Sequence, residues 1–376
     1  MTAARLLSVA TAVPEHVVGQ DDAKALLASL IASDGSPRSA DDESETDWGR
    51  LLAVFDHGGI ATRRICMPIA WYSAEHTFGE RNDLYIEQGL ALAAQAVGRA
   101  LERAGLSPSD IDHVVFVSST GIATPSLDAA LANRLGFRGD VRRTPIWGLG
   151  CAGGAAGLAR AREFAIAAPG SRVLLVALEL CSLAFQRRER SKRNLVAASL
   201  FADGAAAVVV TAAAAGASAR GSAASGPGTT LTIDASASTL WPDTLDVMGW
   251  AIDGDGLHVV FSRDIPAIVR KWVRESVDRF LSAQGVTLAA IKHVVSHPGG
   301  MKVLDAYQEA LSLPAAAFRH ARDVLRERGN MSSPTCLFVL ERFLASGDVA
   351  PGDRAILTAL GPGFSAEYVL LKGVAA

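Results

Sequence analysis

Hydrophobic residues along the chain fall into short runs that predict strands, and longer periodic stretches between them predict helices. Residues 6–13 form one apolar run that we interpret as a buried strand, and residues 146–150 form another. Residues 152–162 and 335–344 carry helical patterns that each follow a glycine-containing turn. The alternation of strands and helices predicts an α/β fold.

The same pattern occurs twice, at a spacing of about 180 residues. A repeat kept in order and register predicts two similar α/β halves, residues 1–211 and 229–376. The Ala-, Gly- and Ser-rich residues 212–228 then form the expected linker. The matching segments are residues 105–115 with 285–295, Gly150-Cys151 with Gly329-Asn330, and residues 168–178 with 350–360.

The repeat also predicts where a functional site should lie. Cys151 and Asn330 occupy equivalent strand-to-helix corners, and His297 ends the second half's copy of the strand that ends near Val117. Packing the halves about a pseudo-twofold axis would bring these three residues together.

Composition excludes several classes of protein. The chain has 376 residues, 49% of them hydrophobic, and a net charge of −3, so it offers no field that attracts nucleic acid or an anionic membrane. No apolar stretch approaches the roughly 20 residues of a membrane span, and the first residues lack a convincing cleavage region, so we expect a cytoplasmic protein. The four cysteines show no CxxC spacing, which argues against a disulfide framework or a metal site.

Cys151 is the candidate nucleophile. It stands between a predicted strand and a predicted helix in Gly148-Leu-Gly-Cys-Ala-Gly-Gly. We expect the positive end of the helix dipole to lower its pKa and to favour the thiolate. The alternative is a small buried hydrophobic residue without chemistry.

His297 and Asn330 are the candidate partners of this thiol. His297 ends a strand and is followed by Pro-Gly-Gly, a position that suits a side chain facing a pocket. Asn330 lies in Gly-Asn-Met-Ser-Ser-Pro before a helix, where it could instead be a helix cap. A structural histidine is the corresponding alternative for His297.

A competing interpretation comes from Gly148-x-Gly150-x-x-Gly153, which matches the dinucleotide-binding fingerprint and follows a strand. Glu179 ends the next strand, where a ribose-binding acid would stand. Against this, a cysteine interrupts the motif, and the equivalent corner at Gly329-Asn330 lacks the glycine pattern.

Four motifs, which span most of the chain, resemble those of the type III polyketide synthases, the group in the thiolase superfamily that includes chalcone synthases. His-Pro-Gly-Gly and Gly-Asn-Met-Ser-Ser-Pro differ from the corresponding motifs of ketoacyl-ACP synthase III. That related condensing enzyme uses a carrier protein, and it remains an alternative. The motifs are residues 148–154, residues 201–210, residues 297–300 and residues 329–334, together with Gly361-Pro-Gly near the C-terminus.

The resemblance implies a homodimer of thiolase-fold subunits with five αβαβα layers, CoA thioesters as substrates, and no metal or redox cofactor. It implies that Cys151 carries the growing chain, while His297 and Asn330 activate it and stabilise the enolate formed when malonyl-CoA loses CO2. An acyl-CoA starter would be extended iteratively and the product cyclised.

The resemblance also assigns pocket residues. Phe201 matches a gatekeeping phenylalanine, while Val259 replaces a second one, so bulk is lost there. Small pocket residues and the phrase Asp246-Val-Met-Gly-Trp250 are similar to bacterial synthases of alkylpyrones and alkylresorcinols, and they predict a medium- or long-chain fatty acyl starter. The further pocket positions are Ser119, Thr120, Thr124, Cys181, Ala184, Ser332, Gly361, Pro362 and Gly363, and the candidates for CoA phosphate binding are Arg50, Arg63 and Arg64.

Overall fold

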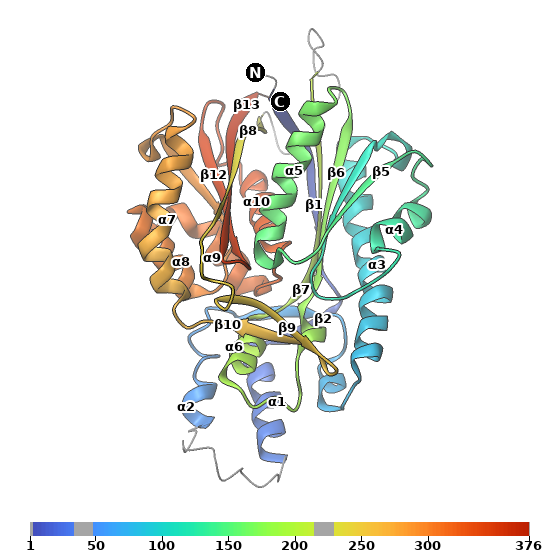
Figure 1. Cartoon of the computed structure of the whole chain (residues 1–376), viewed down its shortest axis with the longest axis vertical. Coiled ribbons are helices and arrows are strands. Elements are labelled where there is room, and N and C mark those ends of the chain that lie inside the picture. Colours follow the sequence, from blue (N-terminus) through green and yellow to red (C-terminus); the bar gives the residue numbers. More distant parts are fainter. Residues whose placement is uncertain (1–2, 34–47, 214–228, 376) are drawn as a thin grey trace.

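The computed structural model describes residues 3–33, 48–213 and 229–375 (Figure 1). Most of the predicted linker, residues 214–228, lies outside the described residues, as does the side chain of Arg50. The proposed boundaries of the two halves therefore stay a prediction.

Nine strands form a sheet in which the two halves repeat one strand order. The strand that opens each half pairs with the strand that closes it, and two parallel-paired strands follow outward. The first half contributes β1 (Ala4–Ala12), β7 (Asp203–Ala212), β6 (Arg172–Leu180), β4 (His113–Val117) and β5 (Arg142–Ile146). The second contributes β8 (Thr229–Leu240), β13 (Ser365–Ala375), β12 (Arg354–Gly361) and β11 (Ile291–Ser296). The repeated sequence segments lead into equivalent strands.

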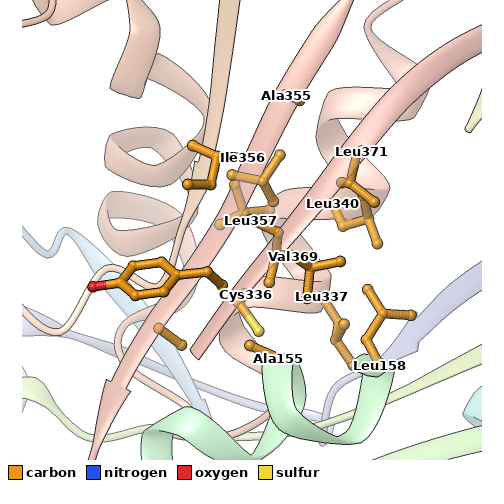
Figure 2. Close-up of a cluster of buried hydrophobic side chains, with 14 of the residues drawn as sticks. Ala155, Leu158, Cys336, Leu337, Leu340, Ala355, Ile356, Leu357, Val369 and Leu371 are labelled. Carbon is orange, nitrogen blue, oxygen red and sulfur yellow. The ribbon is translucent and has the colours of Figure 1, made fainter. Parts of the chain in front are cut away.

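The halves meet where β1 pairs with β8 over a short stretch, with Ala4 opposite Ile233. Helices α5 (Gly153–Ala167) and α10 (Thr335–Ala345) lie between the two sheet halves (Figure 1). Their small residues permit close packing, and Figure 2 shows Ala155 and Leu158 of α5 against Cys336 and Leu337 of α10. These two helices form the central layer.

Strand β6 illustrates why the sheet is buried on both faces. Val173, Leu175 and Ala177 face the core that contains α5, whereas the alternate residues Leu174 and Val176 pack in a second core under α3 (Phe78–Ala104). Side chains of a strand alternate between faces, so a continuous apolar run is what two covered faces require.

Outer helices complete the layers. Thr77 and Glu80 form a capping box that begins α3, and Gly105 ends it in the left-handed conformation. With α4 (Leu127–Leu135), α3 covers the first half; α7 (Ile265–Ser282), α8 (Met301–Leu311) and α9 (Arg319–Arg328) cover the second (Figure 1). The layers agree with the predicted αβαβα arrangement.

The remaining elements gather at one end of the layers, the lower end in Figure 1. They are α1 (Gln20–Ser33), α2 (Trp48–Leu52), α6 (Lys192–Leu200), the pair β2 (His16–Gly19) and β3 (Thr62–Ile65), and the hairpin β9 (Met248–Asp253) and β10 (Gly256–Phe261). Within the described ranges, no helix is long and apolar enough to cross a bilayer.

Candidate active site

The corner that carries Cys151 is a tight turn between β5 and α5. Gly148 and Gly150 have φ values of 91° and 45°, a conformation that glycine adopts without steric cost. The hydroxyl oxygen of Ser119 accepts hydrogen bonds from both of their N–H groups, at 3.3 and 3.2 Å. The predicted turn is therefore present, and Ser119 supports it from below rather than lining a pocket.

The Cys151 thiol is buried and protonated at rest. Its Sγ donates to the hydroxyl of Ser332 at 3.4 Å. Burial raises the pKa of this thiol to about 11, outweighing its hydrogen bonds with Ser332 and Asn330, which lower the pKa. The expectation that the helix dipole leaves a thiolate is wrong for the resting site, because desolvation of the charge dominates. The thiol needs a base when substrate arrives.

His297 is the candidate for that base, because it lines the same cavity as Cys151. Its backbone N–H donates to Thr358 O at 2.8 Å, which fixes the residue at the end of β11, and its side chain is buried. Neither ring nitrogen has a hydrogen-bond partner among the described residues. Burial lowers the pKa of the imidazole to about 3, so it is neutral. Unpaired buried nitrogens cost stability, and such exceptions are typical of groups whose partner is a substrate.

Asn330 is held by both of its amide atoms. Its Oδ1 accepts from Ser332 N at 2.8 Å, and its Nδ2 donates to Gly299 O at 3.2 Å, in the loop after His297. Its second Nδ2 hydrogen is directed to the Cys151 sulfur. The helix-cap alternative is wrong, because α10 begins after Pro334 and Asn330 caps none of its N–H groups.

Cys151, His297 and Asn330 line one cavity of about 770 Å³. The structure thus brings together the three residues predicted to be catalytic, from two corners and one strand end. Lys192, Arg263 and Lys302 line the same cavity but are exposed, so it extends from a positively charged surface to a buried thiol.

A buried carboxylate lies beneath the site and contacts both halves. Glu179 is fully buried at the end of β6 and accepts from Ser119 N at 2.9 Å and from the Thr120 hydroxyl at 2.8 Å. Ser333, in the loop that carries Asn330, donates to its other oxygen at 2.8 Å. Thr120 also accepts from Leu180 N, so the hydroxyl predicted to line the pocket is committed to this network.

A second cavity of about 90 Å³ lies beside the first, and its lining is mostly apolar. Phe201, Val259, Cys181 and Ala184 line it, as their assignment to a pocket predicted. The other lining residues include Val18, Leu26, Leu27, Arg63, Ile65, Ile69, Tyr72, Ser182 and Trp250.

Aromatic rings separate the two cavities. Phe201 packs against Phe261 and Trp250, with ring centroids 5.7 and 6.2 Å apart. Phe261 lines the catalytic cavity, while Trp250 lines the second one. Phe201 therefore lies between the two cavities, and its gatekeeping role stays a prediction. No motif in the sequence indicated Phe261 as its partner.

Two groups of predicted pocket residues are corrected. Thr124 is exposed on the loop before α4 and lines neither cavity. Gly361 is packed so tightly on the Cys151 corner that an added Cβ would lie 2.5 Å from Leu149 O, and Pro362 contacts Gly150. Gly361 and Pro362 thus pack on the corner from outside both cavities, and Gly363, which lies against Leu240, lines neither cavity. Ser332 does touch the nucleophile.

The predicted phosphate-binding arginines are also corrected. Arg63 is buried, and its guanidinium donates to backbone carbonyls of Ala198 and Phe201, so it cannot reach a surface phosphate. Arg64 donates to Glu15 O and lies outside the catalytic cavity. Lys192, Arg263 and Lys302 were missed, because they come from three separate elements and share no motif.

The dinucleotide interpretation fails on packing. An added Cβ on Gly153 would lie 2.5 Å from Val117, and one on Gly154 would lie 2.1 Å from Ser333 O. These glycines permit contact between protein segments and leave no room for a pyrophosphate. Glu179 is sealed in the interior and cannot bind a ribose.

Comparisons with known proteins agree with this geometry. Residues 65–214 match the N-terminal domain of the chalcone and stilbene synthases, and residues 232–375 match the C-terminal domain. The chain is 41% identical over 367 residues to the 1,3,6,8-tetrahydroxynaphthalene synthase of Streptomyces peucetius subsp. caesius, covering 97% of this chain and 92% of that protein. It is 39% identical over 372 residues to a putative chalcone synthase of Bacillus subtilis (strain 168), covering 98% of both. The crystal structure of 1,3,6,8-tetrahydroxynaphthalene synthase from Streptomyces coelicolor A3(2), a bacterial type III polyketide synthase, superposes with a TM-score of 0.88 at 30% identity, covering 99% of this chain and 100% of that one.

The buried Glu179 should make stability depend on pH. Burial raises its pKa from 4.5 to about 7, so its stabilising contribution is complete below pH 4.5 and is lost as the pH rises through 7. The wild type should lose about 3 kcal/mol from this group, a loss that Glu179→Gln cannot show. Urea unfolding at pH 5 to 8 measures the difference between the two proteins. A difference that stays constant with pH, or one that the exposed control Glu87→Gln reproduces, would contradict this assignment.

Proposed function

The chain belongs to the chalcone and stilbene synthase family, the type III polyketide synthases, and on this premise we propose that it joins a medium- or long-chain acyl-CoA to malonyl-CoA units and closes the product to an alkylpyrone or alkylresorcinol. The family, the thiolase fold and the acyltransferase class that the sequence predicted are confirmed by the family match and the structural relatives.

One observation carries the proposal: a single cavity joins three exposed cations to a buried thiol, imidazole and amide. Among the described residues, Lys192, Arg263 and Lys302 have no acidic side chain within ion-pair distance, so their charge is free for CoA phosphates. The narrow pantetheine arm would then reach inward to Cys151. A CoA thioester carries its phosphates at one end and its thioester at the other, so it would place phosphate at the surface and the thioester at the buried thiol.

In the loading step, His297 takes the proton from Cys151, and the thiolate attacks the starter thioester. The C–S bond to CoA breaks, and the departing thiolate takes the proton from the imidazolium. Because Cys151 and His297 are neutral before and after the step, no charged side chain has to remain buried between turnovers. His297 is left with one N–H to donate.

In the extension step, malonyl-CoA loses CO2, and negative charge develops on its thioester oxygen. The N–H of His297 and the Nδ2 hydrogen of Asn330 that faces Cys151 donate to that oxygen. The enolate carbon then attacks the acyl group on Cys151, and the thiolate leaves. The reaction proposed here uses no metal or redox cofactor.

The alkyl tail of the starter would occupy the second cavity, which Val18, Leu26 and Ile65 line with apolar groups. Val259 faces this cavity where a larger residue would fill it. A second candidate product is a polyhydroxylated naphthalene, in accord with the names of two Streptomyces relatives. That skeleton carries no alkyl chain, so the two candidates differ in whether a fatty starter is incorporated.

We also propose a homodimer. β5 is an edge strand of the nine-stranded sheet. Beside it, Trp147 and Ile122 are 51% and 45% exposed, and the Trp147 indole donates to Gly121 O. Large apolar side chains gathered at a sheet edge are typical of an interface between subunits.

A product screen tests the reaction. Purified enzyme is mixed with malonyl-CoA and acyl-CoA starters of roughly 4 to 16 carbons. It should release CoA and yield products that contain the starter, which mass spectrometry identifies. Cys151→Ala should yield none. Products from malonyl-CoA alone, with starters ignored, would contradict the alkyl proposal, and full activity of Cys151→Ala would contradict the mechanism.

Val259→Phe should shift starter preference toward short chains. The added ring fills the second cavity, so kcat/KM should fall about tenfold for a long starter relative to a short one, as the loss of a few buried methylene groups predicts. Val260→Phe is the matched control, because its side chain points to the other face of β10 and lines neither cavity. Equal changes for both variants, or for both starters, would refute the placement of the tail.

Replacing Lys192, Arg263 or Lys302 with Ala should raise KM for malonyl-CoA several-fold, by about 1 kcal/mol of binding for each charge, with kcat little changed. The matched control is a substrate, malonyl-N-acetylcysteamine, which has the thioester but no phosphate. Its KM should not respond to these substitutions. A similar rise for both substrates would show that the three cations do not bind phosphate.

A further inference from the structure

A third cavity, of about 610 Å³, lies between the two halves and shares no lining residue with the catalytic cavity or the second cavity. We call it the crevice. Its walls come from residues within 6–13, in and after β1, and 99–103 of α3, and from residues within 324–328 of α9 and 338–345 of α10. The volume falls within the roughly 300–1,000 Å³ that is typical of small-molecule sites.

The crevice exists because the two halves of the sheet separate early along β1. This strand pairs with β8 only at its first two residues, so the rest of that edge has no strand beside it. Two arginines of α3 bind carbonyl oxygens of β1. Arg99 donates to Thr11 O at 2.7 Å, and Arg103 donates to Val9 O at 2.5 Å. The crevice is thus an open strand edge with cations anchored along it.

The acidic side chains of the crevice are already paired. Among the described residues, its lining contains four arginines and two glutamates. Glu341 accepts from Arg103 and from the Thr11 hydroxyl, each at 2.5 Å. Glu327 accepts from Arg342 at 3.1 Å. Two of the four arginines are therefore committed to carboxylates of the protein.

The other two arginines, Arg99 and Arg328, have guanidinium groups to spare. Arg328 is half-buried and forms no hydrogen bond or ion pair within the described ranges. Arg99 is exposed and uses only one nitrogen, for Thr11 O. A half-buried guanidinium loses part of its hydration and gains no bond in return. An anion in the crevice would supply the missing partner.

The floor of the crevice is apolar. Its side chains belong to the main core and are at most 6% exposed, namely those of Leu6, Val9, Val324, Phe338 and Leu344. A small inorganic anion would leave this surface in water, and a neutral lipid would leave the two arginines unpaired. The combination of charge and apolar area therefore favours a ligand that has an anionic head and an alkyl tail.

We propose that the crevice is a separate ligand site and that it binds a fatty carboxylate. The guanidinium of Arg328 donates to the carboxylate, whose two oxygens match its planar N–H groups. Arg99 adds positive charge, and the alkyl tail packs on the apolar floor. The inference goes beyond the proposed reaction and does not depend on it, because no residue of the crevice lines the cavity of Cys151.

Photolabelling locates the ligand. The enzyme is irradiated with a decanoate that carries a diazirine on its tail, and peptide mass spectrometry identifies the labelled residues. Label should fall on residues 6–13 or 324–345. It should persist with saturating CoA, which the proposed function places in the catalytic cavity. Excess decanoate should suppress this label, whereas decanol, which lacks the charge, and acetate, which lacks the tail, should not.

Two substitutions test the recognition. Arg328→Gln should lower the label in the crevice about tenfold, because a charge-assisted hydrogen bond is lost. Ala345→Phe should lower it as strongly, because Ala345 is exposed and lines the crevice, so the added ring takes the ligand's space without disturbing the core. Arg134→Gln is the matched control, since Arg134 is exposed on α4 and lines none of the three cavities.

Several results would overturn this site. They are an absence of label on residues 6–13 and 324–345, its loss with CoA, unchanged label in Arg328→Gln and Ala345→Phe, or an equal loss in Arg134→Gln. Suppression by decanol or acetate as strong as that by decanoate would show that the head or the tail is not recognised, and would also overturn it. Label that falls only on the lining of the second cavity would support the proposed starter pocket and refute the crevice.

Discussion

The active site depends on one carboxylate that the two halves share. Glu179 accepts from Ser119 and Thr120 of the first half and from Ser333 of the second. Ser119 in turn holds the glycine N–H groups of the Cys151 corner, while Ser333 belongs to the loop that carries Asn330. Hydrogen bonds to the same buried group thereby position two turns that come from distant parts of the chain. The absence of a Cβ at Gly154 lets them approach this closely.

Burial explains the chemistry as well as the packing. A thiol whose pKa is raised and an imidazole whose pKa is lowered are both neutral at rest, so the interior holds no unpaired charge at the nucleophile. Charge appears only when a thioester accepts it. Dry surroundings then strengthen each hydrogen bond to the developing oxyanion and slow the quenching of the enolate by water. Among the described residues the ring nitrogens of His297 have no hydrogen-bond partner, which leaves them available to a substrate.

The sequence predicted the parts of the site that local turns and the repeat determine. The corners at Cys151 and Asn330 follow from glycine-flanked turns, and the duplicated strand order follows from the repeated segments. Residues whose role depends on packing were harder to assign. As a charged residue, Arg63 was expected at the surface, but it is buried among backbone carbonyls. Thr124 was expected in the pocket, but it is exposed on the loop before α4. The thiol pKa was misjudged because a helix-dipole argument omits desolvation. Lys192, Arg263 and Lys302 come from three separate segments that meet only in the folded chain, so no local sequence pattern could predict them.

The central claim is that Cys151, activated by His297, receives the acyl group inside a cavity reached from the charged surface. Peptide mass spectrometry after mixing the enzyme with decanoyl-CoA alone, with the reaction quenched over time, tests it most directly. The account predicts a decanoyl thioester on Cys151 and on no other cysteine, formed much more slowly in His297→Gln. An acyl group on Cys66, Cys181 or Cys336, or equal rates for both proteins, would contradict it.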